Sequence, residues 1–289
     1  MCRLPAPPML RFPDTRVNAM NITSPIRRPF FRTTPVVAVH SSASSPRQWT
    51  RYSEWLDPDV RLYTPFLLGY DAGNPWTNGA PVTLEAEARH ALSGIAADQE
   101  VHLLAHSYGG AIALQAALLR PGLVRSLTLY DPSVFHLLDQ DGASTEQAEQ
   151  IRAVARRVAL LTLSGGHREA AELFVDYWSA PGAWARMAPL RQAEIARRMP
   201  KVRAEFEALF HSRMDVSQLH EAGIPVRIVH GSASPAPARR VVELLRRQLP
   251  RAEVLSMPGL RHMAPLVHRR ELAPFLFPYS LRVEQRLAA

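Results

Sequence analysis

Cysteine is nearly absent from this chain of 289 residues, since Cys2 is the only one. A single cysteine at the N-terminus excludes an internal disulfide framework, a zinc site built on cysteines and a cysteine nucleophile within the fold. A chain of this length buries about three quarters of its unfolded surface, so a hydrophobic core can stabilise it without such crosslinks. The length fits two domains of about 150 residues, or one larger domain that carries an insertion.

Lysine is equally scarce, because Lys201 is the only one and the other Lys or Arg positions are arginine. The formal net charge of +8 would be compatible with a nucleic-acid partner, which needs clustered basic side chains. The arginines are instead scattered along the chain in pairs such as Arg156-Arg157, Arg197-Arg198 and Arg246-Arg247. Such pairs are typical of solvated helix faces, so we expect no nucleic-acid partner.

Long apolar runs are missing as well. No apolar stretch reaches the 18 residues that a membrane-spanning helix needs. Residues 1–34 are rich in proline and arginine and lack the apolar segment of a secretory signal peptide. We therefore expect residues 1–34 to form a loose N-terminal extension. We expect the protein to have no membrane partner and a cytoplasmic location.

Motifs for nucleotides and metals are also lacking. The sequence has no G-x-G-x-x-G after its first apolar run, no G-x-x-x-x-G-K-[ST] and no H-E-x-x-H. The carboxylates at positions 57, 59, 139 and 141 lie near proline or glycine, as turn residues do. The sequence therefore predicts neither a metal ion nor an organic cofactor.

The apolar pattern alternates between short continuous runs and stretches of helical spacing, which predicts an α/β fold. The expected strands are 36–39, 60–65, 101–105, 124–130, 224–230 and 252–257, and the expected helices are 48–56, 83–97, 111–119 and 238–248. This alternation implies right-handed crossovers and a mostly parallel, doubly wound sheet. Between the fourth and fifth strands the pattern stops, and residues 135–220 favour helices. We therefore expect a core of residues 35–134 and 221–289 with a helical insertion at 135–220.

The first candidate for chemistry is Ser107. A nucleophilic serine is projected from a strained strand-to-helix turn, and small neighbours relieve the crowding there. Ser107 stands between an expected strand and an expected helix, with Ala105 and Gly109 two residues away on either side. An ordinary helix N-cap serine is the alternative interpretation. The position between strand and helix favours the nucleophile.

With this turn, the helical insertion and the Pro/Gly loop at residues 258–263, residues 35–278 resemble the α/β-hydrolase superfamily. The resemblance implies an esterase-like member with that fold, a helical lid and no cofactor. It also implies a serine nucleophile, an acid, a histidine base and an oxyanion hole of two backbone amides. Ser107 would be the nucleophile. His262, in the loop after the strand at 252–257, would be the base, and His268 is the competing candidate.

The acid departs from the superfamily's usual pattern. It normally follows the strand that here ends at His230, but residues 231–235 contain no carboxylate and Ser234 occupies the expected position. Some members carry the acid on the strand that follows the nucleophile helix, where this chain has Asp131. Asp131 could instead begin a turn with Pro132. Either the triad lacks its acid or Asp131 supplies it.

The resemblance also locates the oxyanion donors and the substrate pocket. The backbone N–H of Tyr108 and that of Ser42 would bind the oxyanion, although Ser41 stands where relatives carry glycine. The insertion would form a lid over Ser107. Most of its aromatic side chains would form the lid's own core, while Tyr177 and Trp178, together with Ser41, are expected to line the pocket.

These expectations lead to one main hypothesis and two alternatives. The main one is a serine hydrolase that cleaves a small or medium carboxylic ester or thioester through an acyl-serine intermediate. The same fold could instead run carbon-carbon bond hydrolysis, a lyase reaction or perhydrolysis. A non-catalytic binding protein is the second alternative, because the usual acid is missing and Ser41 replaces a glycine.

Overall fold

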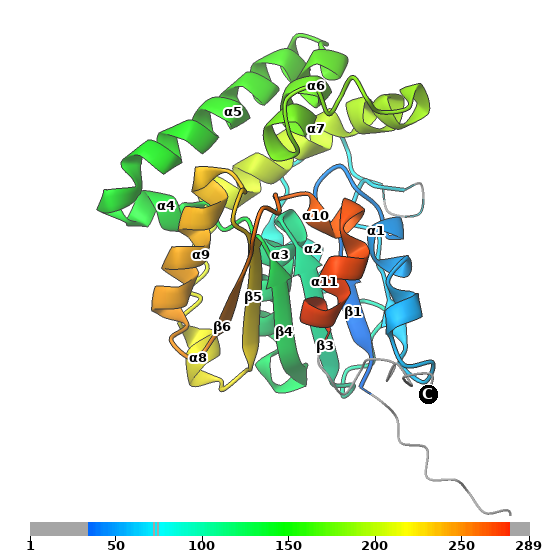
Figure 1. Cartoon of the computed structure of the whole chain (residues 1–289), viewed down its shortest axis with the longest axis vertical. Coiled ribbons are helices and arrows are strands. Elements are labelled where there is room, and N and C mark those ends of the chain that lie inside the picture. Colours follow the sequence, from blue (N-terminus) through cyan, green and yellow to red (C-terminus); the bar gives the residue numbers. More distant parts are fainter. Residues whose placement is uncertain (1–33, 72, 74, 278–289) are drawn as a thin grey trace, which may run out of the picture. The chain divides into compact units, whose positions relative to one another are not determined.

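Six strands form one parallel sheet in the computed structural model, which describes residues 34–71, 73 and 75–277 (Figure 1). The strands are β1 Val36–Val39, β2 Leu62–Tyr63, β3 Val101–His106, β4 Val124–Tyr130, β5 Val226–Gly231 and β6 Glu253–Met257. Their order is β2-β1-β3-β4-β5-β6, and every neighbouring pair is parallel. The predicted fold class, α/β with a mostly parallel sheet, is confirmed. The extension expected at residues 1–34 falls, except for its last residue, outside the described residues.

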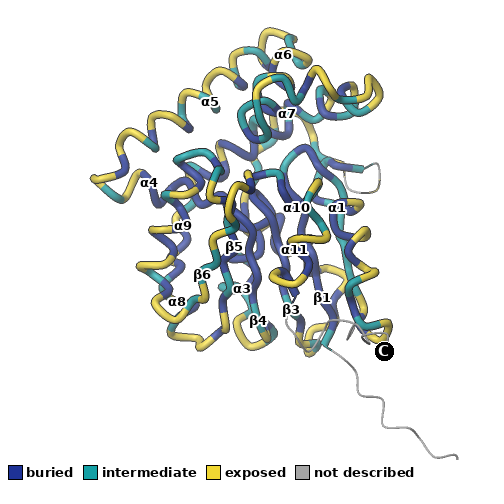
Figure 2. Tube along the Cα trace, viewed as in Figure 1, coloured by how far each residue is buried: buried dark blue, intermediate teal, exposed yellow. Residues whose placement is uncertain are grey.

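Both faces of the sheet are covered, which explains the continuous apolar runs of its central strands (Figure 2). Successive side chains of a strand point to opposite faces. Val37 and Leu103 belong to one buried cluster, shared with the helices at 84–91 (α2), 108–119 (α3) and 236–248 (α9). Val36, Ala38 and Leu104 belong to a second cluster, shared with the helices at 47–50 (α1) and 269–276 (α11). The sheet is therefore the middle layer of three.

The helices that flank the sheet are mostly short. They are α1 Arg47–Thr50, α2 Leu84–Ala91, α3 Tyr108–Leu119, α8 Gln218–Glu221, α9 Ala236–Gln248, α10 Ala264–Val267 and α11 Arg269–Leu276. Single 3₁₀ turns occur at Ser53–Trp55, Pro121–Leu123 and Gly142–Ser144. None of these helices, nor any other helix in the part of the chain that the structure describes, is long and apolar enough to cross a membrane.

Three expected elements are shorter than the pattern predicts. Helix α2 ends at Ala91, since Ser93 and Gly94 favour non-helical backbone, and the Thr83 side chain caps its first turn. The helix expected at 48–56 divides into α1 and a 3₁₀ turn. Strand β2 pairs over two residues only, because it is an edge strand and Pro65 lacks a donor just beyond it.

A helical insertion separates β4 from β5 (Figure 1). Its helices are α4 His136–Gln140, α5 Thr145–Leu163, α6 His167–Trp178 and α7 Pro189–His211. Helices α5, α6 and α7 pack on one another, and buried side chains of α6 and α7 join the cluster beneath them. The outward face of α5 is exposed in Figure 2. The insertion lies over the edge of the sheet at which β3 ends, because residues of α6 and α7 enclose a cavity beside Ser107.

Two glycines allow α3 to approach the sheet closely. A Cβ atom on Gly109 would lie 2.5 Å from the Val39 carbonyl oxygen and 2.6 Å from that of His40. On Gly110 it would lie 2.7 Å from Cβ of Pro132. Side chains at these positions would push α3 away from the strands that it covers.

Replacing Gly109 by alanine is therefore expected to lower the free energy of unfolding by about 1–3 kcal/mol, the usual cost of overpacking. Urea denaturation of the wild type and the variant measures this difference. Gly122→Ala is the matched control, because no atom lies within 4 Å of the added Cβ at that position. Equal destabilisation by the two substitutions would contradict the close approach.

Candidate active site

Ser107 occupies a strained turn between β3 and α3. Its backbone has φ 57° and ψ −121°, values that a residue with a side chain rarely adopts. Its N–H donates to the Tyr130 carbonyl at 3.0 Å, and its carbonyl accepts from the Ser133 N–H at 3.0 Å. These two bonds fasten the turn to the end of β4. They maintain the strained backbone, which costs of order 1–3 kcal/mol, and so hold Ser107 at the carboxyl edge of the sheet.

His262 meets this hydroxyl. Its Nε2 atom lies 2.8 Å from Oγ of Ser107, and its side chain is 1% exposed. Its carbonyl lies 2.8 Å from Nε2 of His106, and Nδ1 of His106 lies 3.1 Å from Nε2 of Gln48. Burial lowers the pKa of His106 well below its usual value, so the ring is neutral. A neutral ring that donates from Nε2 and accepts at Nδ1 satisfies both bonds and anchors the His262 backbone.

Asp131 lies on the far side of the His262 ring. Its Oδ2 atom is 3.4 Å from Nδ1 of His262 and accepts a hydrogen bond from Oγ of Ser234 at 2.6 Å. A separation of 3.4 Å is longer than a normal hydrogen bond. His262 Nδ1 and Asp131 Oδ1 are both buried and lack hydrogen-bond partners. Catalytic hydrogen bonds are often long before substrate binds, and a small rotation would join these two groups.

Ser234 contacts the candidate acid Asp131, which directly follows β4. Ser234 follows β5, at the position where the superfamily pattern usually has a carboxylate. Its hydroxyl donates directly to the Asp131 carboxylate. The side chains of 131 and 234 therefore reach the same place from neighbouring strands. The competing base, His268, lies between α10 and α11 and bonds to Glu271 at 3.2 Å, away from this cluster.

Backbone strain is concentrated here. Among the described residues, three non-glycine residues have positive φ: Ala43 at 54°, Ser107 at 57° and Asp131 at 42°. Each follows the end of a strand, β1, β3 or β4 respectively. Strained backbone of this kind clusters at functional sites, where the surrounding structure maintains it. The coincidence singles out the carboxyl edge of the sheet as the candidate site.

The two expected oxyanion donors also lie at this edge. Tyr108 is the first residue of α3, and the first amides of a helix have no intrahelical acceptor. Ser42 lies in the turn after β1 and lines the same cavity as Ser107 and Tyr108. Ser41 turns away, because its N–H and Oγ donate to Oε1 of Gln48 at 3.2 and 3.1 Å.

The cavity next to Ser107 is enclosed by the insertion. Its wall consists of Ser42, Ser107, Tyr108, Ser133, Phe135, Phe174, Trp178, Val202, Glu205, Phe206 and Leu209. The space open to the centre of a water-sized sphere is about 10 Å³, enough for about one water molecule. The Trp178 ring covers His262, with 4.2 Å between the ring centroids. Tyr177 packs on Trp178 and is not part of this wall.

Glu205 is a site residue that sequence reasoning missed. Its Oε2 accepts from Oγ of Ser42 at 2.5 Å, and its Oε1 accepts from the Tyr70 hydroxyl at 2.8 Å. The Tyr70 oxygen in turn accepts from the N–H of Ala43 at 2.8 Å. One carboxylate of α7 therefore holds two successive residues of the turn after β1.

Glu205 shares one buried cation, Lys201, with a second carboxylate, Glu87. Nζ of Lys201 donates to Glu205 at 3.1 Å and to Glu87 at 2.6 Å, and all three side chains are at most 3% exposed. Burial lowers the pKa of Lys201, but the two carboxylates outweigh it and raise that pKa above its usual value. Burial raises the pKa of Glu87. The single lysine of the chain was the one available signal for this network.

Replacing Glu205 by glutamine is expected to lower kcat about 10- to 100-fold on any substrate that Ser107 turns over. The amide keeps the volume but loses the charge-assisted bonds that hold Ser42, whose N–H is the expected oxyanion donor of that turn. Steady-state kinetics measures kcat and KM separately. Glu207→Gln, an exposed position of the same helix, is the control. A kcat equal to that of the control would contradict this role.

Within residues 34–71, 73 and 75–277, no group of three or more His, Cys, Asp or Glu side chains is arranged to hold a metal ion. The described carboxylates of the site are engaged by serine, tyrosine, lysine and histidine instead.

Most of the chain matches one protein family. Residues 36–275 match the model of the "Alpha/beta hydrolase family". Lipase LipV of Mycobacterium tuberculosis is 33% identical over 156 residues, which are 53% of this chain and 52% of the lipase. The chain therefore matches about half the length of that relative.

Solved structures show the same fold at low sequence identity. A thermophilic esterase from Thermogutta terrifontis has a TM-score of 0.62 at 20% identity, covering 84% of this chain and 87% of its own. A structure from a study of Nitrososphaera gargenis carboxylesterases has a TM-score of 0.63 at 18% identity, covering 85% and 89%. MGS-M2, from a deep-sea metagenome library of the Medee basin, has 0.69 at 13%, covering 85% and 88%.

Proposed function

The chain belongs to the alpha/beta hydrolase family, and from this premise we propose that it is a serine hydrolase that cleaves a small or medium carboxylic ester or thioester. The observation that supports the proposal most strongly is the 2.8 Å contact between Nε2 of His262 and the hydroxyl of Ser107 on its strained turn. A serine placed against a histidine base is the arrangement that activates the hydroxyl for nucleophilic attack.

The mechanism follows from these positions. His262 takes the proton of Ser107 as its oxygen attacks the acyl carbon, and the amides of Tyr108 and Ser42 stabilise the oxyanion. The tetrahedral intermediate then expels the alcohol or thiol, which receives the proton from His262. Water, activated by the same histidine, releases the acid and restores Ser107. Asp131 stabilises the imidazolium that forms in both halves of the reaction.

Two features favour acyl substrates. The wall of the cavity includes several aromatic side chains, with Phe135, Phe174 and Phe206 lining the same space as Ser107. The similar proteins include a lipase and esterases, whose names describe ester cleavage. The carboxylate of Asp131 beside Ser234 also weakens the case for a non-catalytic binding protein, which depended on the missing acid.

We also propose that the insertion acts as a lid. The cavity holds about one water molecule, so α6 and α7 have to move before an acyl group can reach Ser107. Trp178 covers the base in this closed arrangement. Opening would uncover the nucleophile and the base together.

A series of p-nitrophenyl esters from acetate to palmitate tests the proposal. We expect saturable release of p-nitrophenol with one preferred acyl-chain length. That length would indicate the size of the opened cavity. Acyl thioesters form a second arm of the same assay. A folded protein that turns over no ester and no thioester would contradict the proposal and favour carbon-carbon bond hydrolysis, a lyase reaction or perhydrolysis on this fold.

A further inference from the structure

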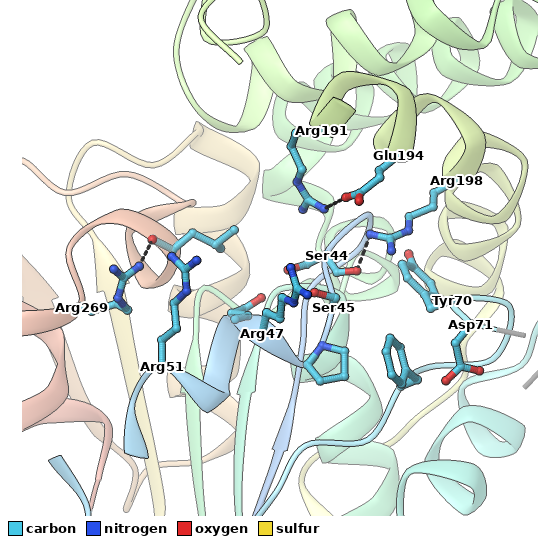
Figure 3. A pocket seen from close by; sticks show the side chains of 14 residues that line it. Ser44, Ser45, Arg47, Arg51, Tyr70, Asp71, Arg191, Glu194, Arg198 and Arg269 are labelled. Atoms are coloured by element: carbon cyan, nitrogen blue, oxygen red, sulfur yellow. Dashed lines mark hydrogen bonds and ion pairs between the residues drawn. The ribbon is translucent and has the colours of Figure 1, made fainter. Parts of the chain in front are cut away.

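A second pocket, lined by arginines, lies outside the catalytic cavity (Figure 3). Its volume is about 520 Å³, within the range of roughly 300–1,000 Å³ that small-molecule sites occupy. Its five guanidinium groups belong to Arg47, Arg51, Arg191, Arg198 and Arg269. They come from α1 and the residue that follows it, from α7 and from α11, and none of the residues that line this pocket lines the cavity at Ser107.

Two of these arginines are held in place by the backbone. Arg198 donates to the carbonyls of Ala43 and Ser44 at 3.1 and 2.7 Å, and Arg191 donates to the Ala43 carbonyl at 3.2 Å. Carbonyls orient a guanidinium group but do not neutralise its charge. Burial, followed by the neighbouring Arg191 and Arg197, lowers the pKa of Arg198, although Tyr70 and Glu194 act in the opposite direction.

Arg47 is the first residue of α1, and Arg51 directly follows that helix. In the part of the chain that the structure describes, Arg47 and Arg51 form neither an ion pair nor a side-chain hydrogen bond, and they lie one helical turn apart. Like charges at this spacing repel each other. Figure 3 shows them below Arg191 and Arg198, at the same opening.

Positive charge therefore exceeds negative charge in this pocket. Asp71 and Glu194 are the two carboxylates among its lining residues. Glu194 pairs with Arg191 at 2.9 Å. Five guanidinium groups around one concavity cost electrostatic free energy, which a bound anion would relieve. A guanidinium group presents a planar fork of donors that fits phosphate and carboxylate oxygens.

We propose that this pocket binds a compact anion that carries two or more negative charges on phosphate or carboxylate oxygens. The site is distinct from the catalytic cavity and does not depend on the proposed ester hydrolysis. The exposed Arg47 and Arg51 supply two contacts, while Arg191 and Arg198 supply contacts already oriented by the turn after β1. The size of the pocket leaves room for an organic body beside Phe66 and Tyr70.

Isothermal titration calorimetry tests this proposal with two probes, inorganic pyrophosphate and citrate, at constant ionic strength set with sodium chloride. We expect saturable binding of at least one probe to a single site of the wild-type protein. The double variant Arg47→Gln/Arg51→Gln is expected to bind that probe about tenfold or more weakly, because two charge-assisted contacts are lost. Tighter binding of pyrophosphate identifies a phosphate ligand, and tighter binding of citrate identifies a carboxylate ligand.

The matched control is Arg239→Gln/Arg246→Gln, two exposed arginines of α9 outside the pocket. It removes the same net charge and is expected to bind like the wild type. Absence of saturable binding of both probes, or an equal loss of affinity in the two double variants, would overturn the proposal. The heat of binding is measured without an ester, so this failure is distinguishable from a failure of the hydrolase proposal.

Discussion

Replacing Ser107 by alanine is expected to lower kcat by about 10⁴- to 10⁶-fold, leaving only the residual catalysis that binding and the oxyanion donors supply. The substitution removes the oxygen that forms the covalent bond to the acyl group. The fold should be little affected, because the strained backbone at 107 is held by bonds from its N–H and carbonyl, which alanine keeps. The measurement is turnover of the preferred p-nitrophenyl ester.

Substitution of a neighbouring serine, Ser133, is the control for Ser107→Ala. Oγ of Ser133 lies 3.3 Å from Oγ of Ser107 and lines the same cavity. It has no contact with His262 among the hydrogen bonds of the described residues, so it lacks a base. If Ser133→Ala abolishes turnover while Ser107→Ala preserves it, the nucleophile has been assigned to the wrong serine.

Replacing Asp131 by asparagine is expected to lower kcat by about 10⁴-fold. The amide has the same shape but cannot stabilise the imidazolium of His262, and its NH₂ group favours the wrong tautomer of the ring. Ser234 can still donate to the amide oxygen, so the thermal midpoint should change little. Kinetics over the pH range in which the wild type is active measures the loss.

An exposed aspartate provides the control for this substitution. Asp98 lies on the surface away from the site, and Asp98→Asn removes the same charge. We expect its kcat to equal that of the wild type. An Asp131→Asn variant with kcat within tenfold of that control would show that Asp131 is a turn residue and that another group acts on His262.

The positions of Ser107 and His262, which meet in the structure, could be predicted from the sequence because each depends on local order. A strand, one serine between small residues and a helix lie within 20 positions, and His262 lies in the loop after the last strand. Asp131 became the candidate acid because residues 231–235, at the end of β5 and just after it, contain no carboxylate. Its contact with Ser234 could not be predicted, because the register of β4 against β5 decides which side chains meet.

The ionic network and the arginine pocket could not be predicted, for a physical reason. Lys201 and Glu87 are 114 residues apart, and Glu205 and Ser42 are 163 apart. No local periodicity reports such pairs. The pattern of arginine pairs predicts solvated helix faces, yet Arg198 of one pair contacts the turn after β1. Ser41 was expected to line the substrate pocket, but Gln48, seven residues away, binds it instead.

The most direct test of the central claim is mass spectrometry of the protein after treatment with a fluorophosphonate, which phosphonylates an activated serine and releases fluoride. We expect one adduct per chain, mapped to the peptide that contains Ser107, and none in Ser107→Ala. The Asp131→Asn variant should form the adduct much more slowly. An adduct on another residue, or ester turnover that continues in protein without any adduct, would contradict the account.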